Sequence, residues 1–205
     1  MRYTLFDTPV ISPLMRGLAF SFLKVFGWRL EGRLPEVDKL VVIAAPHTSN
    51  WDLPVLLSVA FALGVKACWL GKHTLFRRPF GFLFSWMGGI PVYRSASKNM
   101  VAQSVEMFRN SEKLILTIPP EGTRSKVSYW KSGFYYIALG AGIPIAMAFI
   151  DYKRKVSGVG PTLYPTGNIE ADMEVIRNFY ANVTAKYPDK AGLPALAPNQ
   201  YRERY

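Results

Sequence analysis

Short apolar runs alternate along this chain with longer segments of helical spacing, and turn residues such as Gly, Pro and Asn separate them. The apolar runs predict strands at residues 40–45, 65–70, 90–94, 113–118 and 144–151, with residues 162–164 as a further candidate. The helical spacing predicts helices at residues 53–63, 95–110, 133–141 and 170–187. Strands that alternate with helices favour the α/β class. We therefore predict a mixed, mostly parallel sheet flanked by helices.

The N-terminal segment, residues 10–28, is rich in Leu, Phe, Met and Trp, but Arg16 and Lys24 interrupt it. A helix that spans a bilayer needs about 20 predominantly apolar residues, so we predict an amphipathic helix that lies along a membrane surface. The alternative is a helix that packs onto its own domain. We divide the chain into a membrane-associating helical segment, residues 1–30, and a single α/β domain, residues 31–205, whose polar tail from residue 188 is loosely held.

The net charge narrows the class of partner. The 25 Lys and Arg residues outnumber the 14 acidic residues and give a formal charge of +11. An anionic partner is therefore expected: lipid headgroups, a phosphorylated substrate, an acidic carrier or nucleic acid. Charge alone does not choose among these. Cys68 is the single cysteine, which excludes an internal disulfide and favours a reducing compartment.

Residues 44–52 read as the end of a strand, a turn and the start of a helix. His47 lies on this turn, and open α/β sheets bind ligands beyond the carboxyl ends of their strands. Four residues separate His47 from Asp52, so the carboxylate can accept a hydrogen bond from one imidazole nitrogen and leave the other as a base. The alternative is structural, because Ser49-x-x-Asp52 also matches a helix capping box.

Polar side chains follow three other predicted strands: Lys72, Arg94, and the pair Glu121 and Arg124. If these strand ends converge with His47, they form one pocket. Arginines hold phosphate through paired N–H donors, and Lys72 adds a point charge. Glu121 is predicted either to bond an acceptor hydroxyl or to fix Arg124. The alternative for the arginines is ordinary surface solvation, and for Glu121 a simple ion pair.

Three motifs, in this order and separation, resemble those of the glycerolipid acyltransferases, of which the lysophosphatidic acid acyltransferases are the best known. They are His47-Thr48-Ser49-Asn50-Trp51-Asp52, Gly89-Ile90-Pro91-Val92-Tyr93-Arg94-Ser95 and Pro120-Glu121-Gly122-Thr123-Arg124-Ser125. Ile143-Pro144-Ile145 resembles the fourth motif, and the resemblance runs from about residue 41 to residue 148. Three motifs in order are more specific than any one of them.

The resemblance implies that His47 is a general base and Asp52 its orienting partner. It further implies that Arg94, Glu121 and Arg124 bind a phosphorylated acceptor. The predicted substrate-binding set is Lys72, Arg94, Glu121, Gly122, Thr123 and Arg124.

The resemblance also implies the reaction. The family transfers a fatty acyl chain from an acyl-CoA or acyl-carrier-protein thioester to the free hydroxyl of a lysophospholipid such as 1-acyl-sn-glycerol-3-phosphate, in phospholipid biosynthesis. It uses direct attack and no metal or bound cofactor. Its members work at the cytoplasmic face of the cell membrane, so this chain is expected there as a peripheral protein on an anionic surface.

The sequence departs from the family's usual motifs at a few positions, while the predicted catalytic pair is intact. The departures are Pro46, Thr74, Pro119 and Ala146-Met147. These residues are expected around the headgroup and acyl pockets. An amino-acid-containing lysolipid or another glycerolipid therefore stays open as the acceptor.

Four other functions are less favoured. A covalent acyl-enzyme would need Cys68 or Ser49 beside the base, and the chain has no Gly-x-Ser-x-Gly elbow. A metal site built from His47, His73 and Asp52 matches no common ligand spacing. A nucleic-acid binder is disfavoured because no recognition module is visible, and a non-catalytic basic membrane-surface protein stays open.

Overall fold

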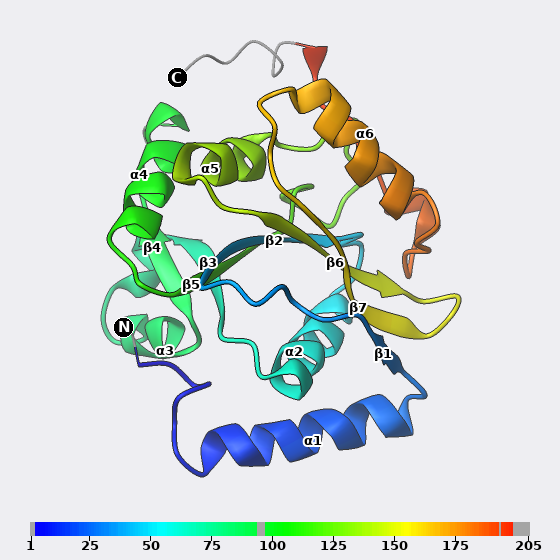
Figure 1. The fold of residues 1–205 in the computed structure, drawn as a ribbon. Helices are drawn as coiled ribbons and strands as arrows, with labels where there is room; N and C mark the ends of the chain where they lie inside the picture. Colours follow the sequence, from blue (N-terminus) through cyan, green and yellow to red (C-terminus); the bar gives the residue numbers. More distant parts are fainter. Residues whose placement is uncertain (1–2, 94–96, 193, 199–205) are drawn as a thin grey trace.

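The computed structural model describes residues 3–93, 97–192 and 194–198, with the backbone alone for residues 97–99. Its centre is a seven-stranded sheet with the strand order β1-β7-β6-β2-β5-β3-β4 (Figure 1). The strands are β1 (Arg29–Glu31), β2 (Lys39–Ala45), β3 (Ala67–Lys72), β4 (Gly89–Val92), β5 (Leu114–Ile118), β6 (Ile145–Asp151) and β7 (Val156–Leu163).

Most neighbouring strands in the sheet are parallel, which confirms the predicted α/β class. β6, β2, β5, β3 and β4 run in one direction, β7 is antiparallel to β6, and β1 pairs parallel with β7. The central strand β2 is buried on both faces; Val41 and Ile43 on one face and Leu40 on the other have no exposed surface. A strand covered on both faces has a continuous run of apolar residues, which explains why the sequence predicts a strand at residues 40–45.

Helices cover both faces of the sheet, with α4, α5 and α6 on one face and α1 and α2 on the other (Figure 1). The helices are α1 (Ile11–Val25), α2 (Asp52–Leu63), α3 (Gly81–Trp86), α4 (Ser97–Arg109), α5 (Gly133–Ala141) and α6 (Ile169–Tyr180), with short 3₁₀ turns η1 (His73–Phe76) and η2 (Pro188–Lys190). α2 and α5 each end at a glycine in the left-handed conformation, Gly64 and Gly142, as the sequence predicts.

The structure contains β1 and α3, which are not among the predicted elements, and it also differs from them near the C-terminus. β7 begins at Val156 rather than at residue 162, and its glycines hid it because Gly is depleted in strands. A Cβ added to Gly158 would lie 1.9 Å from the Glu31 carbonyl oxygen, so β1 can approach β7 only at a glycine. α6 ends at Tyr180, seven residues earlier than predicted.

The prediction of a loosely held tail is wrong for the part that approaches Trp130. Leu196 is buried, and the Trp130 N–H donates to the Ala195 carbonyl oxygen at 2.7 Å. The tail contains few apolar residues, but Leu196 is enough to fix this part of it to the core. Residues 199–205 of the predicted tail lie outside the described part of the chain.

α1 is an amphipathic helix that contacts its own domain through one side. Ala19 and Leu23 are buried, and Ala19 packs with Phe61 of α2. Leu14, Leu18 and Val25 are 59%, 54% and 79% exposed and, at 100° per residue, form one stripe on another side of the helix. No helix in the described residues is long and apolar enough to cross a bilayer.

Candidate active site

His47 lies on the turn between β2 and α2, at the carboxyl end of the central strand. Its Nδ1 is 3.1 Å from Asp52 Oδ2, and Asp52 is completely buried while the His47 side chain is 23% exposed. The contact expected from the four-residue separation is therefore present. The imidazole reaches the surface of the protein, whereas its carboxylate partner does not.

The Asp52 carboxylate also fastens the turn to the start of α2. Its Oδ2 accepts hydrogen bonds from the backbone N–H groups of Thr48 and Ser49, both at 2.8 Å. The Ser49 hydroxyl in turn accepts from the Trp51 N–H at 3.1 Å. The bond from the Ser49 N–H is one half of a capping box, but the other half is missing because the Ser49 hydroxyl accepts from Trp51 and not from Asp52. The structural and the catalytic interpretations of Asp52 are thus compatible, because one carboxylate serves both contacts.

The environment of Asp52 keeps it ionised. Burial by itself would raise the pKa of Asp52, but the hydrogen bonds from His47, Tyr152 and the Ser49 N–H outweigh burial, and the pKa lies below its usual value. An ionised carboxylate only accepts hydrogen bonds, so the His47 Nδ1 must carry a proton. In the neutral imidazole the lone pair is then on Nε2, the nitrogen available as a base.

Glu121 lies just beyond β5 and holds the His47 turn from the neighbouring strand. Its Oε2 accepts from the His47 backbone N–H at 2.7 Å, and the residue is 3% exposed. Among the described residues its Oε1 has no hydrogen-bond partner. Burial raises the pKa of Glu121 to about 7, although the His47 N–H opposes the shift.

The rest of the Glu121 motif forms an exposed loop beside the His47 turn. Arg124 donates a hydrogen bond to the Asn50 side-chain oxygen, so the loops after β2 and β5 are joined a second time. Gly122 has φ +68°, and a Cβ there would lie 2.8 Å from the Lys131 Nζ. Thr123 is exposed, and its hydroxyl accepts from the Ser125 N–H at 3.3 Å.

The two remaining predicted binding residues belong to strands farther along the sheet. Lys72 is the exposed last residue of β3, which is separated from β2 by β5. Arg94 lies outside the described residues. The assignment of these side chains to substrate binding stays a prediction. His73, which the metal alternative requires, stacks on Tyr93 with the ring centroids 4.7 Å apart.

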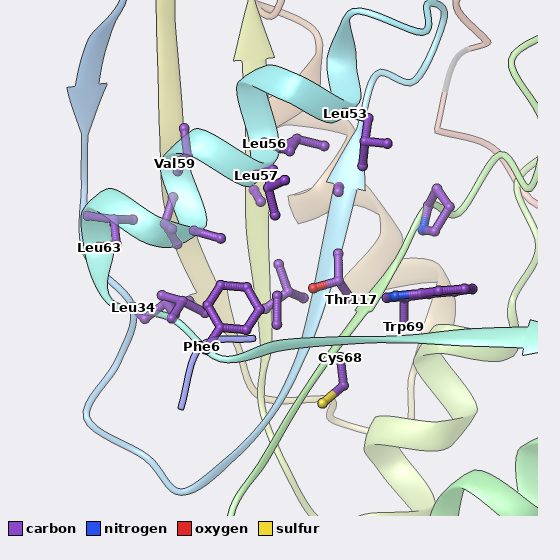
Figure 2. A pocket seen from close by; sticks show the side chains of 18 of the residues that line it. Phe6, Leu34, Leu53, Leu56, Leu57, Val59, Leu63, Cys68, Trp69 and Thr117 are labelled. Carbon is purple, nitrogen blue, oxygen red and sulfur yellow. The ribbon is translucent and has the colours of Figure 1, made fainter. Parts of the chain in front are cut away.

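An apolar cavity of about 500 Å³, which His47 helps to line, follows α2 (Figure 2). Leu53 and Trp69 lie at one end of the view, and Phe6, Leu34 and Leu63 at the other. Its other walls come from Val42, Ala44, Leu56, Leu57, Val59, Ala60, Val65, Ala67, Cys68, Phe84, Met87, Thr117, Pro119, Ala148, Gly158 and Val159. The sequence analysis missed the cavity because its walls come from many separate segments. Cys68 belongs to this wall.

A family model described as Acyltransferase matches residues 28–150, which is more than half of the 205-residue chain. The chain belongs to the acyltransferase family. It is similar in fold to the crystal structure of the 1-acyl-sn-glycerophosphate (LPA) acyltransferase PlsC from Thermotoga maritima, with a TM-score of 0.58, 17% sequence identity, and coverage of 86% of this chain and 81% of that chain. A search of curated proteins gives no match.

Tyr152 is a residue of this acyltransferase site that the sequence analysis missed. Its hydroxyl donates to Asp52 Oδ1 at 2.8 Å, and its ring meets Trp28 edge to face at 5.1 Å. Burial and the neighbouring carboxylate raise the pKa of Tyr152 far above its usual value, so the hydroxyl keeps its proton. The signal was its position directly after β6, because β6 is the neighbour of β2 and ends at the same edge.

We expect Tyr152→Phe to lower kcat about 10- to 100-fold with little change in KM, because removal of a hydrogen bond to a buried charged group costs roughly 1.5–3 kcal/mol. Without this donor the pKa of Asp52 rises, so the fall of kcat on the acidic side should begin at a higher pH. Steady-state kinetics across the pH range test this, with the exposed Tyr164→Phe as the control. A loss of kcat with an unchanged pH profile would assign Tyr152 to folding alone.

We expect the free energy of unfolding to depend on pH because the pKa of Glu121 is raised in the folded state. Because its folded-state pKa of about 7 exceeds the usual 4.5, the unfolded chain releases this proton first, and stability falls as the pH rises between those values. Relative to Glu121→Gln, wild type should lose about 2–3 kcal/mol of unfolding free energy between pH 5 and pH 8. Urea denaturation measures this, and Glu174→Gln, an exposed residue of α6, should show no such trend. A constant difference would place the Glu121 pKa near its usual value.

Proposed function

We propose that this acyltransferase moves a fatty acyl chain from an acyl-CoA or acyl-carrier-protein thioester to the free hydroxyl of a lysophospholipid. The observation that carries the proposal is the position of His47. A partly exposed imidazole, oriented by a buried carboxylate, lies against an apolar cavity of about 500 Å³. Such a base next to an acyl-sized cavity suits an alcohol that attacks a fatty acyl carbonyl.

In the proposed reaction His47 acts as a general base. Its Nε2 takes the proton of the acceptor hydroxyl while that oxygen attacks the thioester carbonyl carbon. A new C–O bond forms, the C–S bond breaks, and the leaving thiolate receives the proton from the imidazolium. The ionised Asp52 stabilises the imidazolium in between, and catalysis of this kind contributes typically 10²–10⁴-fold.

The cavity supports the assignment of a long apolar chain to this site. Its lining is almost entirely Leu, Val, Ala, Phe and Met side chains, with Thr117 and the His47 ring among the few polar groups. α2, which forms one wall, is 12 residues and therefore about 18 Å long. We assign the cavity to the transferred acyl chain, with the thioester carbonyl at His47.

The acceptor we propose is 1-acyl-sn-glycerol-3-phosphate. Arg124 is fixed beside the catalytic turn by Asn50, and a guanidinium group binds phosphate through paired N–H donors. Lys72 and Arg94 complete the proposed phosphate set, with Glu121, Gly122 and Thr123 shaping the loop. No metal and no bound cofactor enter this scheme.

We further propose that the protein acts as a peripheral protein at the cytoplasmic face of the cell membrane. The exposed apolar stripe of α1 and the formal charge of +11 support this location. Each basic residue near an anionic surface adds about 1 kcal/mol to binding. The membrane then supplies the lysophospholipid and receives the product.

We expect His47→Ala to lower acyl transfer at least about 100-fold, the low end of the effect of a general base. The assay uses the full chain with both thioester donors and a panel of lysolipids that includes 1-acyl-sn-glycerol-3-phosphate and an amino-acid-containing lysolipid. His73→Ala is the matched control and should retain turnover. Equal turnover of His47→Ala and wild type would refute the base assignment. Wild type that transfers no acyl group to any acceptor would favour a non-catalytic membrane protein.

We expect changes at the end of the cavity far from His47 to alter the preferred acyl length. Phe6→Ala enlarges this end and should favour longer chains, whereas Leu34→Trp shortens it and should favour shorter ones (Figure 2). Competition between thioesters of different chain length measures the preference for each variant. The two variants control for each other. A general loss of packing would shift the preferred acyl-chain length of both variants in the same direction.

A further inference from the structure

The segment that contains η1 and α3 divides its aromatic side chains between the interior and the solvent. Phe76 and Phe84 pack with Trp69, at centroid distances of 6.1 and 6.4 Å from its ring. Phe80 and Phe82 instead are 64% and 75% exposed. Two further apolar side chains of this segment, Leu75 and Leu83, are also exposed, at 43% and 36%. These four exposed residues, Leu75, Phe80, Phe82 and Leu83, are called the α3 patch below.

The backbone beneath the α3 patch is closely packed, so the exposed rings are held in a defined arrangement. A Cβ on Gly81 would lie 2.0 Å from the Phe76 carbonyl oxygen, so α3 can pack on η1 only at a glycine. The Ser85 hydroxyl donates to the Gly81 carbonyl oxygen at 3.0 Å. A patch presented in this way is a built feature of the surface rather than the consequence of a loose loop.

The charge around the α3 patch favours an anionic lipid surface as its partner. Arg77 and Arg78 are exposed and are separated from Phe80 only by Pro79. No acidic residue occurs anywhere between residues 53 and 105. Apolar and aromatic side chains flanked in sequence by basic residues suit insertion among anionic headgroups. Asp7, in the segment bonded to Trp86, is paired with Lys66. A protein partner, including a second copy of this chain, would be expected to meet a surface of mixed charge.

The α3 patch is continuous with the segment that leads into α1. The Leu5 N–H donates to the Trp86 carbonyl oxygen at 2.7 Å, and the Trp86 indole N–H donates to the Thr8 hydroxyl at 2.9 Å. α1 and α3 therefore lie at the same end of the molecule, opposite α5 and α6 (Figure 1). On its inner side α3 contributes Phe84 to the cavity wall.

We propose that the α3 patch is a second membrane-inserting element, which works together with the exposed stripe of α1. Phe80 and Phe82 enter the headgroup region of an anionic bilayer, and Arg77 and Arg78 contact the lipid headgroups. Contact at two separate elements fixes the orientation of the domain, which contact through one helix would leave free to rotate. The proposal rests on the proposed function in taking a bilayer as the source of the lipid acceptor.

A fluorescent probe tests insertion without any turnover. Phe82→Cys is labelled with an environment-sensitive nitrobenzoxadiazole group in a Cys68→Ala background and mixed with phosphatidylglycerol/phosphatidylcholine vesicles. The emission should shift to the blue, and lipids brominated on their acyl chains should quench it. The same label at Tyr164→Cys, an exposed position beyond β7, should do neither. An unquenched label at residue 82 on bound vesicles would overturn the proposal.

Vesicle partitioning tests the energetic contribution of the α3 patch. Phe80→Ser/Phe82→Ser should weaken binding at least about tenfold, since each ring loses its apolar burial. The control Tyr164→Ser/Val175→Ser removes two exposed apolar side chains elsewhere and should bind as wild type does. Leu14→Ser/Leu18→Ser should also weaken binding. If the α1 pair weakens binding and the Phe pair has no effect, α3 is not a membrane element.

Two further measurements separate this proposal from its rivals. If wild type sediments as a dimer that the Phe pair converts to a monomer with unchanged vesicle binding, the patch is a subunit interface and the proposal fails. Turnover of a water-soluble short-chain lysolipid should change less than about twofold in the Phe pair, because His47 and the cavity are untouched. Wild type that inserts but transfers no acyl group would refute the proposed function and leave the membrane element standing.

Discussion

The buried carboxylate of Asp52 is the interaction on which the site depends. An unpaired charge in the interior is strongly destabilising, so an ionised Asp52 with no exposed surface is tolerated only where donors surround it. Two backbone N–H groups of the catalytic turn, the His47 ring and the Tyr152 hydroxyl supply them. The same contacts set the path of the turn, the start of α2 and the tautomer of the imidazole. Folding of this turn and orientation of the imidazole are therefore one event.

The order of the strands explains how distant segments support this carboxylate. β5, β2 and β6 are neighbours and run parallel, so their carboxyl ends meet at one edge of the sheet. Glu121 follows β5, His47 follows β2 and Tyr152 follows β6. Glu121 holds the backbone of the turn and Tyr152 holds its carboxylate. The His47 backbone is thus held from one neighbouring strand and its carboxylate partner from the other, while the His47 side chain stays 23% exposed.

The sequence predicts much of this arrangement, and the features that it does not predict have physical causes. The buried strands and the contact between His47 and Asp52 depend on local pattern, so the sequence predicts them well. The contact of Tyr152 with Asp52 depends on which strand lies beside β2. The spacing of residues along the chain does not predict this strand order. β7 was predicted too short because its glycines match loop composition, although each is required by a close neighbour. Glu121 is predicted to bond an acceptor hydroxyl or to fix Arg124, and its bond to the His47 backbone appears only in the folded structure.

The surroundings of α2 link the cavity to the N-terminal helix. Apart from Asp52 and Ser58, all of its residues are apolar, and all of these except Leu53, which is 64% exposed, are at least partly covered. The cavity and the sheet lie along one side, and α1 covers another through Ala19 and Leu23. Removal of α1 would expose α2 and open the wall of the cavity. Weaker membrane binding by a chain without α1 would therefore not distinguish loss of a membrane contact from loss of the fold. The exposed stripe of α1 and the α3 patch can be changed without disturbing that wall, because their side chains already face solvent. The proposed membrane contact and the proposed acyl binding therefore involve one structural unit, and only substitutions on its outer surface separate them.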